Sequence, residues 1–210
     1  MATVRVVFVG PGTQANGLSA TPQGLWVCDQ QDDRVYLVRY DGSILTSFAT
    51  PARNMSGVGF GAGLVWAASN QRPAYVYAFD PATGHCTRAI ELPNAREGGI
   101  HGLEVIDGKL WVTRPGLGVI QRLNLETGAL EHEIPFPGRR SHGIYGADGA
   151  IVCVDTNLAT VFHLDPTDGR VLQQWTIEGF EPHGMTRAPD GQIWVCDATT
   201  NLVGVVQGAP

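Results

Sequence analysis

The sequence predicts an all-β fold, a five-bladed β-propeller whose blades are four-stranded antiparallel sheets. The first observation is a repeat that opens with a polar residue followed by glycine, with the polar residue at positions 16, 56, 101, 142 and 183. The steps between these positions are 40, 45, 41 and 41 residues, which is a fixed period with one insertion. The second observation is that each period holds four short apolar segments with no helical periodicity. This combination is typical of a propeller.

The elements of one repeat follow in a constant order. A first strand runs from the polar-glycine pair into a turn, and the pairs Asp107-Gly108, Asp148-Gly149 and Asp190-Gly191 predict tight hairpins because glycine tolerates positive φ. The second strand carries Trp at positions 26, 66, 111 and 194, which we expect in the core between blades. A third strand leads into a glycine turn such as DPATG, and a fourth strand ends the repeat.

The glycine that follows each repeat-opening residue predicts a crowded axis. First strands of neighbouring blades meet at the centre of a propeller, where a residue without Cβ permits close approach of the backbones. We therefore interpret these glycines as architectural.

The ends of the chain predict how the ring closes. The fifth repeat stops after its third strand, near Val206, and residues 2–9 have the pattern of the missing fourth strand. We expect one domain over residues 1–210, with blades at 14–51, 54–93, 99–137, 140–180 and 181–210 completed by 2–9. An open array completed by a second chain is the alternative.

Composition limits the partners. The formal charge of −6 and pI near 5.4 argue against nucleic acid or an anionic membrane, because both select basic proteins. No apolar run approaches the roughly 20 residues of a membrane span. The segment MATVRVVFVG lacks the features of a signal peptide, so we expect a cytoplasmic protein with a small-molecule substrate. The oligomeric state is not predicted.

Propeller topology predicts one functional face. The start of the first strand and the end of the second strand of each blade lie on the same face of the ring. The five start positions are Asn16, Ser56, His101, His142 and His183. The five end positions are Asp29, Ser69, Arg114, Asp155 and Asp197.

Three histidines at one phase of the repeat predict a metal site. His101, His142 and His183 would converge at one mouth of the channel, and imidazole ligates zinc, iron, copper or nickel. We expect a divalent ion there, with zinc, iron, manganese, nickel or magnesium as the possible metals. Asp155 and Asp197 would orient ring N–H groups or act as bases. The alternative is that each polar side chain only caps an interblade turn, a role that suits the two non-histidine start residues.

Other charged and polar residues on this face are candidates for substrate contacts. Arg114 is the arginine placed nearest the channel and could bind a carboxylate or phosphate, although solvated loop charge is the alternative for it and for Arg139 and Arg140. The possible accessory residues are Asn16, Ser56, Asp29, Glu97 and Glu181.

The stretch HGMTRAPDGQIWVCD resembles the repeat of streptogramin lyases, whose blades read His-Gly-Ile, Pro-Asp-Gly and Leu-Trp-Phe-Thr-Glu. The chain is similar, more distantly, to NHL-type and gluconolactonase propellers. In streptogramin lyases a channel histidine and a carboxylate, with bound magnesium, open a ring by elimination. The resemblance implies such roles for His183 and Asp197, with aspartate here in place of the family's glutamate.

Together these features predict a metal-dependent enzyme that acts on a small, possibly anionic molecule at the central channel. The three histidines would hold the metal, and Asp197 or Asp155 would move the proton in an elimination, isomerisation or lactone hydrolysis. Two alternatives stay open. One is a non-catalytic propeller that binds a ligand or a protein. The other is a non-haem iron oxygenase, because three histidines can also hold ferrous iron.

Overall fold

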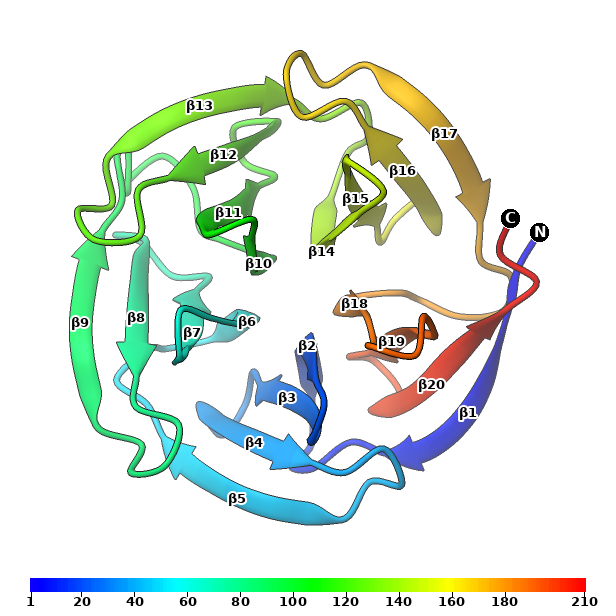
Figure 1. Cartoon of the computed structure of the whole chain (residues 1–210), viewed down its shortest axis with the longest axis horizontal. Coiled ribbons are helices and arrows are strands. Elements are labelled where there is room, and N and C mark those ends of the chain that lie inside the picture. Colours follow the sequence, from blue (N-terminus) through cyan, green and yellow to red (C-terminus); the bar gives the residue numbers. More distant parts are fainter.

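A computed structural model describes all residues from 1 to 210 and shows five four-stranded antiparallel sheets arranged around a central axis (Figure 1). The prediction of an all-β, five-bladed propeller is confirmed. Every element is a strand, and no helix is long and apolar enough to cross a membrane.

Four blades are formed by consecutive strands. Blade one contains β2 (Ala15–Thr21), β3 (Gly24–Asp29), β4 (Arg34–Val38) and β5 (Ile44–Ala49). Blade two contains β6 (Met55–Gly61), β7 (Leu64–Ser69), β8 (Tyr75–Phe79) and β9 (Cys86–Glu91). Blade three contains β10 (Leu103–Ile106), β11 (Lys109–Arg114), β12 (Val119–Leu123) and β13 (Leu130–Pro135). Blade four contains β14 (Ser141–Ala147), β15 (Ala150–Asp155), β16 (Thr160–Leu164) and β17 (Val171–Thr176).

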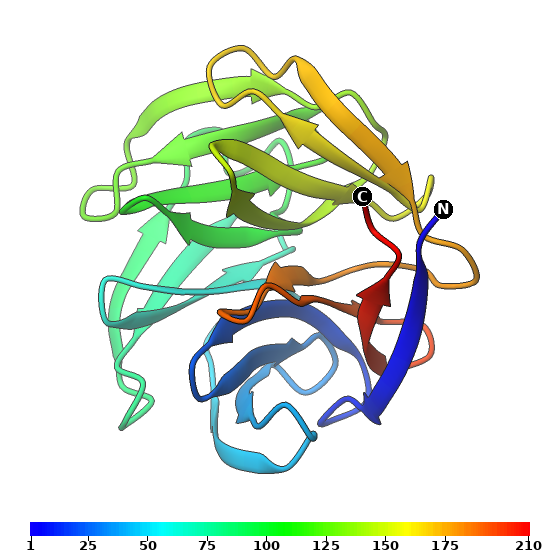
Figure 2. The same ribbon diagram turned by 45° about the vertical axis from the view of Figure 1, so that its right-hand side comes forward.

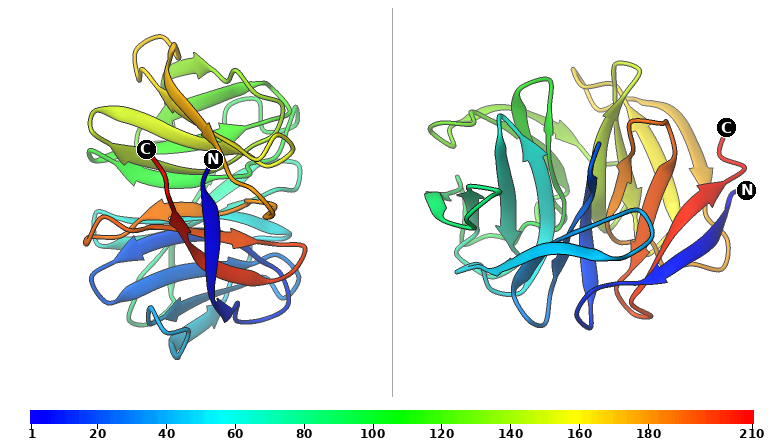
Figure 3. Two further views of the ribbon diagram at one scale, coloured as in Figure 1. Left: turned by 90° about the vertical axis from the view of Figure 1, so that its right-hand side faces the viewer. Right: turned by 60° about the horizontal axis from the view of Figure 1, so that its bottom comes forward.

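The fifth blade joins the two ends of the chain. It contains β18 (Met185–Arg187), β19 (Ile193–Asp197), β20 (Leu202–Gln207) and, on its outer edge, β1 (Thr3–Val9). Strand β1 pairs antiparallel with β20 from Thr3 opposite Gln207 to Val9 opposite Leu202. The two termini consequently lie side by side at the rim (Figures 1 and 3). The chain closes its own ring, as the sequence predicted.

The core lies between the blades. The second strands are buried along almost their whole length because each is covered on both faces by neighbouring blades, whereas the outermost strands are largely exposed. This stacking of sheets around the axis is visible in Figure 2. The predicted tryptophans belong to four separate hydrophobic clusters, which confirms their role in the core. They are Trp66, Trp194, Trp26 and Trp111.

Two of the three predicted tight hairpins form as expected. Asp107-Gly108 and Asp148-Gly149 both have positive φ, at 50° and 70° in the first pair and 52° and 78° in the second, which is the geometry of a type I′ turn. The third connection is longer, because β18 ends at Arg187 and β19 begins only at Ile193.

These first hairpins define one face of the ring, which we call the hairpin face. The opposite face carries the connections between blades together with the loops between second and third strands, and we call it the loop face. Figure 3 shows the ring from the side, with these two sets of connections at opposite ends of the strands.

Five glycines close the axis of the ring. A Cβ placed on Gly17 would come within 2.9 Å of the backbone nitrogen of Val58 in the next blade, and Gly57 and Gly184 face neighbouring backbones as closely. On Gly102, a Cβ would overlap the carbonyl oxygen of His142. The space enclosed by this glycine ring, which is Gly17, Gly57, Gly102, Gly143 and Gly184, leaves no room for a water molecule.

The glycine ring gives a direct test of this packing. We expect Gly102→Ala to lower the free energy of unfolding by about 3 kcal/mol or more, because two strands at the axis would have to separate. Gly116→Ala is the matched control, since its Cβ would have its nearest neighbour at 3.5 Å. Urea denaturation measures both values, and equal stability of the two variants would contradict this account.

Candidate functional site

The loop face brings the start and end positions of each blade together. Ala15 pairs with Asp29 and Ser141 with Asp155, and the backbone N–H of His101 donates to the carbonyl of Thr113. The five start residues therefore surround the axis directly below the glycine ring. All of them are buried except His101, which is partly exposed.

The three imidazoles form a continuous row. His101 Nδ1 lies 2.8 Å from His142 Nε2, and their ring centroids are 4.4 Å apart at an interplanar angle of 71°. The rings of His142 and His183 meet edge to face, with centroids 4.8 Å apart. We call these three residues the histidine row.

His183, at one end of the histidine row, is held by local contacts. In one tautomer of His183, Nδ1–H donates to the carbonyl oxygen of Glu181 at 3.1 Å, and in the other Nδ1 accepts the backbone N–H of Ala198 at 3.3 Å. Its Nε2 lies 3.7 Å from a carboxylate oxygen of Glu181. The ring of His183 therefore has little freedom to turn. His101, at the other end of the row, keeps its Nε2 free of any hydrogen bond within the protein.

Burial keeps the histidine row neutral. Loss of solvation lowers the pKa of His101 to about 4, and it lowers the pKa of His142 well below its ordinary value. The pKa of His183 is lowered by burial as well. The positive charge of Arg140 acts in the same direction on all three rings. At neutral pH each ring therefore carries one N–H donor and one acceptor nitrogen.

Several polar atoms around the histidine row have no partner in the protein. A buried polar atom without a hydrogen bond costs about 1 to 3 kcal/mol, so such a group favours the binding of a water or a ligand. The unpartnered buried atoms in this region are Asn16 Oδ1, Ser56 Oγ, Ser141 Oγ and His142 Nδ1.

The histidine row does not fit a three-histidine metal centre in this arrangement. No three histidine, cysteine, aspartate or glutamate side chains in the structure are placed to hold an ion together. Two nitrogens on a tetrahedral zinc lie roughly 3.3 Å apart with both lone pairs aimed at the ion. The 2.8 Å contact between His101 and His142 is instead the length of a shared hydrogen bond. Metal binding by these residues therefore stays a prediction from sequence.

The aspartates at the end positions organise the loops. Asp155 accepts the backbone N–H of Arg139 and Arg140 through Oδ2 and that of Leu158 through Oδ1. Asp29 holds its own pair of loops in the same way, with four backbone N–H groups.

Asp197 differs from these two aspartates. Its Oδ1 accepts the N–H groups of Thr199 and Thr200, while its Oδ2 makes no hydrogen bond in the protein. Its negative charge acts to raise the pKa of His183, against the larger effect of burial. A role in proton transfer stays a prediction for Asp155 and Asp197, and Asp197 alone has a free oxygen for it.

Arg114 is fully buried inside the connection that precedes blade three. Its guanidinium donates to the carbonyl oxygens of Pro93, Asn94 and Gly98, and to the side chain of Gln121. The structure thus gives this side chain a supporting role in the loop. Its predicted contact with substrate stays untested.

The accessory residues occupy two kinds of position. Asn16 donates to Gln30 at 2.6 Å, and Ser56 is buried beside the axis. Glu181 is nearly half exposed and lies 4.0 Å from a guanidinium nitrogen of Arg140. Glu97 is exposed in the connection before blade three.

Sequence reasoning named Arg140 only as one of the loop arginines and gave it no role beside the histidines, whereas its positive charge acts on all three imidazoles. The signal for it was its place two residues before a repeat-opening histidine.

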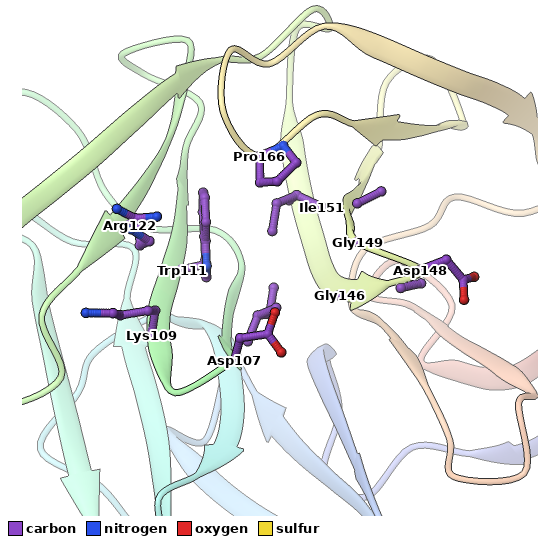
Figure 4. Close-up of a pocket in the computed structure, with 12 residues that line it drawn as sticks. Asp107, Lys109, Trp111, Arg122, Gly146, Asp148, Gly149, Ile151 and Pro166 are labelled. Carbon is purple, nitrogen blue, oxygen red and sulfur yellow. The ribbon is translucent and has the colours of Figure 1, made fainter.

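The principal cavities lie elsewhere, on the rim and the hairpin face. A cavity of about 330 Å³ lies between blades three and four, with Trp111 and Arg122 on one wall and Asp107 and Asp148 at its edges (Figure 4).

The sequence matches no protein family and no curated protein. Solved structures do share the fold. Glutaminyl cyclase from Myxococcus xanthus is 13% identical with a TM-score of 0.79, over 98% of this chain and 96% of that one. A streptogramin B lyase is 16% identical with a TM-score of 0.63, over 97% of both chains. A catalytically inactive His-to-Ala variant of virginiamycin B lyase from Staphylococcus aureus, solved with quinupristin, is 19% identical with a TM-score of 0.60, over 95% of this chain and 68% of that one.

These comparisons confirm the resemblance to streptogramin lyase-like propellers at the level of the fold. Two of the similar structures are lyases and one is a cyclase.

The neutral histidine row predicts a loss of stability in acid. Each imidazole has a lower pKa in the folded protein than in the unfolded chain, so protons favour unfolding as pH falls from about 6.5 to about 4. For His101 alone the loss approaches about 3 kcal/mol at the acid end. Denaturation across this range should show a shallower slope for His101→Gln, and an unchanged slope would contradict the pKa assignment.

Proposed function

We propose that this propeller is an enzyme that transfers protons on a small, anionic molecule bound at the histidine row. The observation that carries the proposal is the pairing of His101 and His142. A neutral imidazole with a free, accessible Nε2 is held there by a 2.8 Å bond from its other nitrogen. An imidazole fixed in this way is a general base or acid with a defined direction.

His142 would act as a positioning residue. If His101 Nδ1–H donates to His142 Nε2, the tautomer of His101 is set, and its Nε2 carries the lone pair that accepts a proton. The buried and unpartnered Nδ1 of His142 then offers a hydrogen bond to a bound water or substrate group.

An anionic substrate suits the electrostatics of this site. Burial keeps the pKa of His101 low, with further lowering by Arg140 and His183, which makes it a weak base in the free protein. A bound carboxylate or a developing enolate would compensate the charge of Arg140 and raise the pKa of His101 toward neutrality. Substrate binding would therefore activate the base.

The favoured reaction is an elimination. His101 Nε2 would take a proton from the carbon next to a carbonyl, the freed electron pair would form a carbon–carbon double bond, and the leaving group would depart with its own electron pair. The resulting imidazolium would return the proton to that group. The lyases among the similar structures, one inactivated by a His-to-Ala change, support this class of reaction. Isomerisation and lactone hydrolysis need the same proton transfers.

Turnover should depend on the His101 imidazole. We expect His101→Gln to lower kcat/KM by about 10²- to 10⁴-fold, because glutamine fits the space but transfers no proton. The substrates to screen are quinupristin, a peptide with N-terminal glutamine and a set of sugar lactones. His132→Gln, on an outer strand, is the matched control.

Asp197→Asn belongs in the same screen, since it removes a negative charge and keeps the turn. If Asp197→Asn loses turnover while His101→Gln stays fully active, the base is Asp197 and not His101. If wild-type protein binds these compounds but turns over none, the non-catalytic binding alternative is favoured.

The metal prediction has its own experiment. Because the histidine row does not converge on one point, we expect turnover to be unchanged by a chelator and by added zinc, iron, manganese, nickel or magnesium. Elemental analysis of purified protein is compared with a variant carrying His101→Ala, His142→Ala and His183→Ala. Near-stoichiometric metal that disappears in the folded variant would restore the metal-dependent mechanism, and oxygen uptake with bound iron would indicate the oxygenase.

A further inference from the structure

A second polar cavity lies at the opposite mouth of the channel. It has a volume of about 270 Å³ and is lined by residues from the first strands of all five blades. These include Ala20, Phe60, Glu104, Tyr145 and Thr186. The glycine ring separates it from the histidine row, so it is not part of the site described above.

The wall of this cavity contains one buried carboxylate, that of Glu104, which is only 8% exposed. Its Oε2 accepts the hydroxyl of Ser19 at 2.7 Å, and its Oε1 accepts the N–H groups of Phe60 at 3.1 Å and Val105 at 2.9 Å. Groups from three blades therefore fix one orientation of the carboxylate. One hydrogen-bonding site on Oε2 stays free.

No positive charge compensates Glu104. Arg187 lines the same cavity, but its guanidinium pairs with the carboxylate of Asp148 at 3.3 Å. The other charged or titratable groups facing the cavity are Asp107 and Tyr145. Burial raises the pKa of Glu104 to about 7, against the lowering effect of its three hydrogen bonds. Both the geometry and the charge balance thus leave room for a cationic partner.

We propose that this cavity binds a small organic amine, whose ammonium group donates to the Glu104 carboxylate. An ammonium supplies both the missing hydrogen-bond donor and the missing positive charge. A divalent metal is disfavoured, because the cavity has no group of ligands placed to hold one. A simple anion would have to bind beside an uncompensated carboxylate.

The test is calorimetric titration of the wild-type protein with n-butylamine and 1,4-diaminobutane. Binding of a protonated amine requires ionised Glu104, so affinity should rise about tenfold between about pH 6 and pH 8. Glu104→Gln keeps the shape and should bind at least tenfold more weakly at pH 8, with no pH dependence. Asp190→Asn removes one exposed charge from the same face outside the cavity and should bind like wild type.

Three results would overturn the proposal. They are an affinity that does not change with pH in the wild type, equal affinity of Glu104→Gln and wild type, or equal weakening by Asp190→Asn. The wild-type pH profile decides the question even if Glu104→Gln fails to fold. His101→Gln leaves this cavity intact. Amine binding by that variant is therefore independent of the proposed enzyme activity, and either proposal can fail without the other.

Discussion

The close contact of five glycines at the axis is the constraint on which the rest of this molecule depends. At each of these glycines the first strand of one blade contacts the backbone of the next blade directly. The five blades therefore close at a radius that leaves no space for water at the axis. The tight radius brings the repeat-opening residues below it within direct contact. Side chains that would line an open channel in a wider ring therefore stack on one another, and His101, His142 and His183 form a buried row.

The same closeness determines the chemistry available on each face. Imidazoles packed together and away from water stay neutral, and His101 and His142 share a 2.8 Å hydrogen bond. In this arrangement the three rings are not placed to hold one ion together. The aspartates at the ends of the second strands accept backbone N–H groups of the loops and so hold the loops around the histidine row in place. On the hairpin face a cavity lies beside the carboxylate of Glu104.

The fold could be predicted from the sequence because its signals are local and repeated. The spacing of the opening pairs, the Asp-Gly turns and the strand-two tryptophans each report a single blade, and repetition removes ambiguity. The pairing of β1 with β20 also followed, since one strand was missing and one was left over.

The chemistry of the site was less predictable. The sequence placed three histidines at one mouth, but the direction of each ring depends on packing across blades. Glu104 was missed because LEVI has the pattern of an ordinary inner strand. Its signal was that the equivalent residues in the other repeats, Ser19, Gly59, Tyr145 and Thr186, are all uncharged.

The pairing of β1 with β20 has a consequence for how the protein is made. Thr3 and Gln207 are partners at opposite ends of the described chain, so at ribosomal rates of 5 to 20 residues per second β1 waits about 10 to 40 s for its neighbour. During that time an apolar strand, TVRVVFV, presents unpaired edges to every other nascent chain nearby. Closure of the ring therefore has to wait until β20 has been synthesised, and until then β1 can pair with other chains.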